Sequence, residues 1–138
     1  NMGIVAACVT FLFGSLRVNS IGVNLVLLIG AAKMMIPVYL KHLIIAIPLT
    51  VNGIICGIVA YVLNIKGTPL SAGFGYTGLV GPINALNRMS GDTSFNIIML
   101  IIGYFVVPFT GAFIVHHLCK KFIHSYSDEI YQFEIPKE

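Results

Sequence analysis

The sequence has 138 residues, of which 57% are hydrophobic and only 9% are charged, and its mean hydropathy is +0.94. Soluble domains carry about 25% charged residues, so this composition excludes a soluble monomer. It also excludes disordered, collagen-like and coiled-coil chains. The net charge is only +3 and the basic residues are scattered, which excludes a nucleic-acid-binding protein. We therefore expect an all-α, polytopic membrane protein.

The first 40 residues hold two apolar runs that are too short to cross a bilayer alone. Residues 2–16 give about 22 Å of helix and resemble the end of a membrane span. Residues 21–32 are shorter still and contain Asn24 and Gly30. This second run is either a half-span or a helix joined at an angle to the segment that passes Pro37, and the sequence leaves both possibilities open.

Two later runs are long enough to span the membrane. Residues 42–63 and 95–118 contain 22 and 24 residues, or about 33 and 36 Å of helix, against a hydrocarbon core of about 30 Å. The glycines and prolines inside them are tolerated in a bundle, where neighbouring helices satisfy the freed backbone groups. We predict that both runs are membrane-spanning helices.

The segment between these two spans is rich in glycine. Residues 67–91 hold six of the 14 glycines and two of the six prolines, yet they are largely apolar. A solvated linker would be polar. Irregular backbone is allowed at membrane depth only where protein or a wet cavity covers it, so we predict a re-entrant hairpin here.

The last 20 residues carry seven of the 13 charges and are expected in water. We therefore divide the chain into a membrane domain, residues 1–118, and a tail, residues 119–138. Four lysines near the span ends on the tail side, against Lys66 and Arg88 on the other side, place the tail in the cytoplasm. We expect it to be weakly structured, with Tyr131, Phe133 and Ile135 in a short extended pattern.

The glycine-rich segment contains a literal GxGxxG at Gly73, Gly75 and Gly78. A dinucleotide site needs a strand before this motif and an acidic residue about 20 positions later at the end of a second strand. Here a helical span precedes the motif, and the nearby Asp92 lies in a turn. The motif therefore predicts backbone with positive φ and exposed amides, rather than a nucleotide site.

The helix predicted over residues 79–89 carries polar groups on one face. Asn84, Asn87 and Arg88 fall at i, i+3 and i+4, and Thr77 precedes them. Their donors and acceptors suit a polyhydroxy ligand, so we predict these four side chains as substrate contacts. The alternative is that they cap the hairpin, bond nearby backbone or lie among lipid head groups. The predicted backbone positions of the hairpin are Gly73, Gly75, Gly78, Gly81 and Pro82.

The sequence predicts no metal site and no cofactor. His116, His117, Cys119 and His124 cluster near the end of the last span, but their spacing does not supply four ligands. We expect these histidines to face anionic lipid head groups beside Lys120 and Lys121. The three cysteines are expected to be buried free thiols.

Residues 67–84 resemble the glycine-rich signature of a bacterial membrane protein family that is similar to the IIC subunit of the phosphoenolpyruvate-dependent phosphotransferase system. Its core reads Gly73-Phe-Gly-Tyr-Thr-Gly-Leu-Val-Gly81, and some members are named perfringolysin regulators. The order of a proline-marked start at 33–37, one span, the signature and a last span also fits. The resemblance implies that the chain is the C-terminal part of a longer multi-pass bundle in the bacterial cell membrane.

The resemblance implies translocation of a sugar or related polar solute. It implies cytosolic IIA and IIB components as partners, beside membrane lipids, and a homo-oligomer is expected. No catalytic or phosphoryl-accepting residue is identifiable, so we expect no enzymatic activity from this chain. The alternative function is that of a non-transporting membrane regulator that acts through its cytoplasmic tail.

Overall fold

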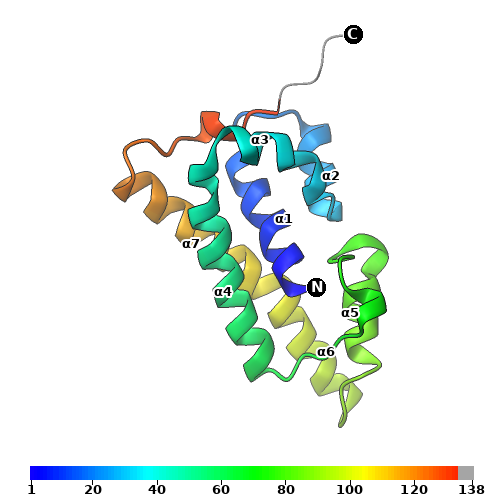
Figure 1. Ribbon diagram of the computed structural model, residues 1–138. Helices are drawn as coiled ribbons and strands as arrows, with labels where there is room; N and C mark the ends of the chain where they lie inside the picture. The colour runs from blue at the N-terminus through cyan, green and yellow to red at the C-terminus, as the bar shows by residue number, and fades with distance from the viewer. Residues whose placement is uncertain (134–138) are drawn as a thin grey trace.

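The computed structural model describes residues 1–133, and the regular structure in this part of the chain is helical (Figure 1). A π-helical segment, Ile102–Val106, joins the last two helices without a break. Short 3-10 turns at Ala32–Met35, Leu43–Ile45, Pro69–Ser71, Thr77–Leu79 and Asp128–Tyr131 make up the rest. The helices are α1 (Met2–Ser15), α2 (Ile21–Ile29), α3 (Ile36–Lys41), α4 (Ala46–Val62), α5 (Val80–Leu86), α6 (Thr93–Ile101) and α7 (Val107–Phe122).

Long apolar helices occupy both positions where the sequence predicts membrane spans. They are Leu43–Val62, with 20 residues, and Thr93–Phe122, with 30, and both are long and apolar enough to cross a membrane. The second helix begins earlier than predicted because Asp92 caps it, accepting a hydrogen bond from the backbone of Ser94 (3.3 Å). It also ends later, at Phe122, so the first residues of the predicted tail are helical.

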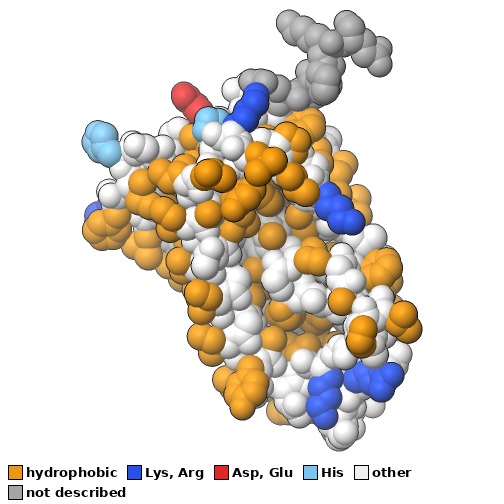
Figure 2. All heavy atoms as spheres, in the orientation of Figure 1, with side chains coloured by type: hydrophobic (Ala, Val, Ile, Leu, Met, Phe, Trp, Pro, Cys, Tyr) orange, Lys and Arg blue, Asp and Glu red, His pale blue; other side chains and the backbone are white. Residues whose placement is uncertain are grey.

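The outer faces of these helices are apolar. On α4, exposed apolar side chains recur every three or four residues, at Ile47, Val51, Ile54, Ile58 and Tyr61. Such a stripe requires an apolar environment, either lipid or another helix. On the face shown in Figure 2, apolar side chains cover the length of the bundle, while charged and histidine side chains gather mainly towards its two ends. The composition and this surface together indicate a membrane protein.

Helices α1, α4 and α7 pack against one another and enclose a buried polar side chain. Asn52 is fully buried where they meet. Its Nδ2 donates to Thr10 Oγ1 (3.0 Å) and to the carbonyl oxygens of Ala6 and Pro108 (both 3.3 Å). An intramembrane amide that is satisfied by two neighbouring helices fixes their register.

This junction lies at the middle of both long helices. Asn52 is the tenth of the 20 residues of Leu43–Val62, and Pro108 is the sixteenth of the 30 residues of Thr93–Phe122. Because the two residues are hydrogen-bonded, the helices cross near their midpoints. The junction therefore marks the middle of the membrane domain.

The run at residues 21–32 is a helix joined at an angle to the segment that passes Pro37, which is the second of the two possibilities that the sequence left open. Ser20 caps α2, and Gly30 ends it with φ +116°, a left-handed conformation that favours glycine. The chain then continues through a 3-10 turn into α3, which runs across the end of the bundle in Figure 1.

The expectation of a weakly structured tail is wrong for residues 119–133. Tyr126 and Tyr131 are buried and pack against the ends of α1 and α7. Tyr131 lies in a 3-10 turn, so the predicted extended pattern is wrong there, while Ile135 lies outside the described residues. The alternation of apolar and polar residues suggested an extended strand. The conformation here is instead set by a long-range contact, in which the Tyr131 ring packs against Gly14 of α1.

Candidate functional site

A cavity of about 640 Å³ opens between α1, the connection from α2 to α3, and the glycine-rich segment. Its walls come from three separate stretches of sequence, two of which are not regular α-helix. The residues that line it are Gly3, Ile4, Ala7, Gly30, Ala31, Ala32, Lys33, Ala72, Gly73, Phe74 and Thr77. Such broken backbone beside a cavity is the usual construction of transporter binding sites.

The cavity reaches the middle of the membrane domain. Asn52 marks this level and bonds the carbonyl oxygen of Ala6 (3.3 Å). Ala7 is the next residue of α1 and lines the cavity. The cavity therefore reaches the level at which the two long helices cross.

The glycine-rich segment reaches the cavity wall because its backbone takes left-handed conformations. Gly73, Gly75 and Gly78 have φ of +96°, +55° and +59°, values that favour glycine. A Cβ atom on Gly75 would come within 2.9 Å of Ile4 Cγ2, so the segment lies directly on α1. At Gly81, a Cβ atom would come within 2.5 Å of the Gly75 carbonyl oxygen, which shows how closely α5 packs on the turn before it.

A second cavity, of about 460 Å³, adjoins the first and shares Gly3 and Ala72 with it. A chain of polar side chains runs beside it. Asn1 Nδ2 donates to Ser71 Oγ (3.0 Å), and Thr68 Oγ1 donates to Asn84 Oδ1 (3.1 Å). Thr68 and Ser71 also form a reciprocal capping box. Of these four polar residues, Asn1 and Thr68 line the second cavity, and Ser71 and Asn84 bond to them.

The structure separates the four predicted substrate contacts. Thr77 lines the first cavity, and its Oγ1 lies 3.1 Å from the position that a Cβ atom on Gly30 would occupy. Asn84 is half-buried and bonds Thr68 beside the second cavity. Asn87 and Arg88 are exposed and line neither of these cavities. The four side chains therefore differ in exposure and in the cavity that they adjoin, and a binding role for each of them stays a prediction.

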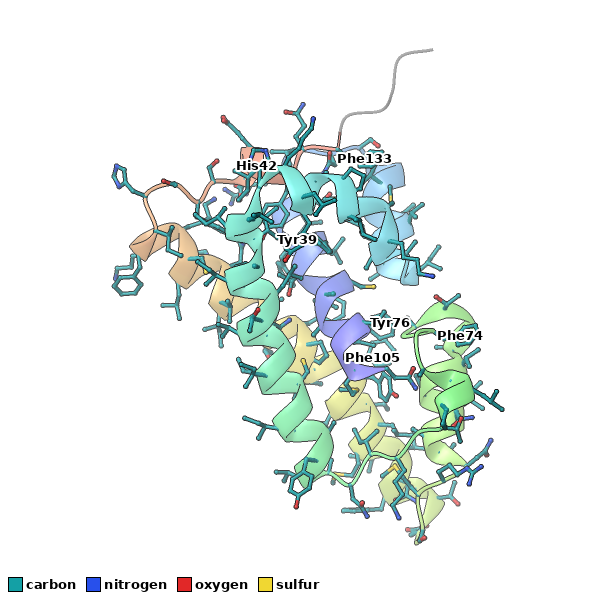
Figure 3. The ribbon with its side chains drawn as sticks, in the orientation of Figure 1. Tyr39, His42, Phe74, Tyr76, Phe105 and Phe133 are labelled. Carbon is teal, nitrogen blue, oxygen red and sulfur yellow. The ribbon has the colours of Figure 1, made fainter. Side chains whose placement is uncertain are left out.

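Aromatic residues attach the glycine-rich segment to the last long helix, and the sequence analysis missed this role. The Tyr76 hydroxyl donates to the Tyr104 carbonyl oxygen, and the Tyr76 ring stacks on Phe105 at 5.2 Å between centroids. Pro108 has no N–H to offer the carbonyl four residues before it, which is that of Tyr104. In Figure 3, Phe74, Tyr76 and Phe105 gather where the segment meets the bundle. The position four residues before a proline is the signal that could have located this acceptor.

A polar network closes the opposite end of the bundle. His116 is buried and contacts Tyr126 through Nδ1 (2.8 Å) and Asp128 through Nε2 (3.0 Å). Lys120 Nζ donates to the same carboxylate (2.7 Å), and the Tyr126 and Tyr131 hydroxyls share a hydrogen bond of 2.6 Å. His116 therefore points inward, which corrects the expectation that it faces lipid head groups.

Charge and burial set the protonation of this network. Burial raises the pKa of Asp128, but the hydrogen bond and charge of Lys120, together with His116, outweigh it and hold the pKa below its ordinary value. Burial raises the pKa of Tyr126 and Tyr131. Within residues 1–133, no three His, Cys, Asp or Glu side chains converge as metal ligands. The network thus holds the tail against the bundle. Cys8, Cys56 and Cys119 are buried free thiols, as expected from the sequence.

The long apolar helices and the apolar surface indicate a helical membrane protein. A family model described as "Phosphotransferase system, EIIC" matches residues 1–133, so the chain belongs to this family. This confirms, at the level of the family, the resemblance seen in the glycine-rich signature. No curated protein and no solved structure matches the chain.

Proposed function

We propose that this chain is part of the membrane permease component of a phosphotransferase system and that the first cavity holds a sugar or related polar solute during translocation. Family membership supports a transport component. The main support for the proposal is that Ala7 and Thr77, from separate stretches of sequence, line one cavity, and that Ala7 follows Ala6, whose carbonyl oxygen bonds Asn52.

We also propose that residues 67–91 form a re-entrant hairpin. Two contacts support this proposal: Gly75 packs against Ile4, and the Tyr76 hydroxyl bonds the Tyr104 carbonyl oxygen near the middle of the last long helix. Backbone groups that are irregular at this depth are acceptable where they line a water-filled cavity. The hairpin then supplies Thr77 and exposed amides to the solute.

Among the predicted contacts, Thr77 has the strongest support because it lines the first cavity. Asn84 comes next, because it bonds Thr68, which lines the second cavity. Asn87 and Arg88 are proposed as further contacts because their spacing places them on the same helical face as Asn84. The signature at residues 67–84 supports placement in the perfringolysin-regulator-like branch and in the C-terminal part of the membrane domain. Cytosolic IIA and IIB components and a homo-oligomeric assembly belong to the same proposal.

The proposal is tested by uptake of labelled sugars into vesicles that contain the full-length protein. Thr77→Val removes one hydroxyl from the cavity wall, and a lost hydrogen bond to a solute costs about 0.5–1.5 kcal/mol, or roughly two- to tenfold in affinity. Thr110→Val is the matched control, because Thr110 is exposed on α7 and bonds its own helix (2.7 Å to the Val106 carbonyl). Equal uptake by both variants at limiting sugar would contradict the proposal.

A further inference from the structure

Lys33 is the one charged side chain among the residues that line the first cavity. It lies in the 3-10 turn Ala32–Met35, three residues after Gly30 ends α2. Within residues 1–133 its ammonium group has no acidic partner, since the ion pairs of this region involve Arg17, His116 and Lys120 with Asp128. The cavity therefore holds a positive charge that the described part of the chain does not balance.

Lys33 is exposed, and the cavity that it lines reaches the level of Asn52. Ala7 and Lys33 line the same space, and the Ala7 stretch of α1 lies at the level of Asn52, midway along the long helices. Charged groups at membrane depth are costly and mark solute or ion pathways. The C-terminal dipole of α2 favours a cation nearby, but it amounts to only about half of one elementary charge and does not balance the lysine.

We infer that the transported solute is an anion and that Lys33 binds its carboxylate, which makes sugar acids, rather than neutral sugars, the substrate class. A lysine offers three donors and no acceptor, which suits an anionic group better than a hydroxyl. A phosphate monoester carries a charge of about −1.5 to −2 at pH 7, so one lysine would leave it partly unbalanced. A carboxylate carries the single charge that Lys33 neutralises, while Thr77 and the glycine backbone are left for the hydroxyls. This inference rests on the proposed function.

The test measures protection of Lys33 from acetylation in the full-length protein in lipid nanodiscs. Acetic anhydride is applied with glucose, glucuronate, galactose, galacturonate, gluconate or glucose 6-phosphate at equal concentration and ionic strength, and each lysine is followed by mass spectrometry. Lys121 is the internal control, because it is exposed in the last turn of α7 and does not line the first cavity. We expect at least one carboxylated sugar to slow acetylation of Lys33 while its neutral counterpart does not, with Lys121 unchanged.

The affinity of the protecting sugar acid is then compared between variants. A hydrogen bond to a charged group accounts for about ten- to a hundredfold in affinity. We expect Lys33→Met to lose this amount and Lys33→Arg, which keeps the charge, to retain most of the binding. A loss that is equal in both variants would overturn the inference in favour of a structural role.

The remaining outcomes separate the possible partners of Lys33. Equal protection by a sugar acid and its neutral counterpart, or stronger protection by glucose 6-phosphate alone, overturns the inference. Protection that depends only on anionic phospholipid in the nanodisc assigns Lys33 to a lipid head group and also overturns it. If neutral sugars are taken up in a Thr77-dependent way, the proposed function stands and the inference falls. If no sugar of either kind changes Lys33 labelling or is taken up, both fall.

Discussion

The side-chain amide of Asn52 lies directly against Gly111, so that a Cβ atom at position 111 would collide with Asn52 Oδ1. Because Gly111 of α7 has no side chain, α4 can place the polar side chain of Asn52 between the helices. The amide then reaches the carbonyl oxygen of Pro108 on one side and Thr10 Oγ1 on the other. This contact fixes the level at which α1, α4 and α7 meet, and with it the depth of the cavity.

We predict that Gly111→Ala and Asn52→Ala both destabilise the bundle. Interhelical hydrogen bonds in membranes contribute about 0.6 kcal/mol on average and up to about 1.7, so Asn52→Ala should cost about 1–2 kcal/mol. The measurement is thermal unfolding of the purified protein in detergent. Gly53→Ala is the matched control, because a Cβ at that position would have no contact within 4 Å beyond its own stretch of helix. A loss at Gly53 as large as that at Gly111 would contradict this account.

We predict that Tyr76→Phe loosens the glycine-rich segment without unfolding the long helices. The variant keeps the ring that stacks on Phe105 but leaves the Tyr104 carbonyl without the hydroxyl donor, at a cost of about 1–3 kcal/mol for a buried acceptor. Hydrogen exchange should accelerate in residues 67–91 and stay unchanged in α4. Exchange that is unchanged in the segment would show that this hydrogen bond does not hold it.

The tail network predicts a specific dependence on pH. The pKa of Asp128 is lowered in the folded protein, so its contribution to stability is present above the unfolded-state pKa, about 3.9. This contribution is lost as pH falls through the folded-state pKa. The tail should therefore stay fastened at neutral pH and begin to detach below about pH 4.

Detachment can be followed at Cys119, which is buried in the same cluster as Tyr126 and Tyr131. Its reaction with dithiodipyridine, which also modifies thiols in acid, should accelerate on acidification. Asp128→Asn should react faster than the native protein already at pH 7 and respond less to acid. The same acid response in both proteins would exclude Asp128 as its source.

The cytoplasmic location predicted for the tail can be tested by labelling. A single cysteine at Ser125, which is exposed between α7 and the last 3-10 turn, should resist an impermeant thiol reagent applied to intact cells and react after lysis. The basic residues beside the tail favour the cytoplasmic side. Rapid labelling in intact cells would show that the tail lies outside the cell, which contradicts the prediction.

Composition and run length were enough to predict the helical class and the two long apolar helices, because each residue contributes to them independently. The buried positions of Asn52 and His116 could not be predicted in this way. Each depends on a partner far away in sequence, Thr10 and Pro108 for Asn52 and Asp128 for His116. The same limit applies to the cavity, whose walls come from α1, the turn after α2 and the glycine-rich segment.

Helix-type hydrogen bonds continue past the last residue of α5, from the Asn87 N–H to the Ile83 carbonyl oxygen (3.1 Å) and from the Met89 N–H to the Ala85 carbonyl oxygen (3.0 Å). The helical spacing of Asn84, Asn87 and Arg88 does not show how exposed each side chain is. Asn84 is half-buried and bonds Thr68, whereas Asn87 and Arg88 are exposed. Lys33 was counted among the basic residues of the cytoplasmic side, and its place in the cavity depends on the end of α2 at Gly30, which the sequence pattern did not predict.

Chemical modification of Thr77→Cys in the folded, full-length protein tests the central claim, that the first cavity is the solute site. The native cysteines of the described residues are buried, so a methanethiosulfonate reagent added after purification fills the cavity without affecting folding. We predict that modification abolishes uptake, that the transported solute slows the modification, and that modified Ser125→Cys transports normally. Full uptake by the modified Thr77→Cys protein would contradict the claim.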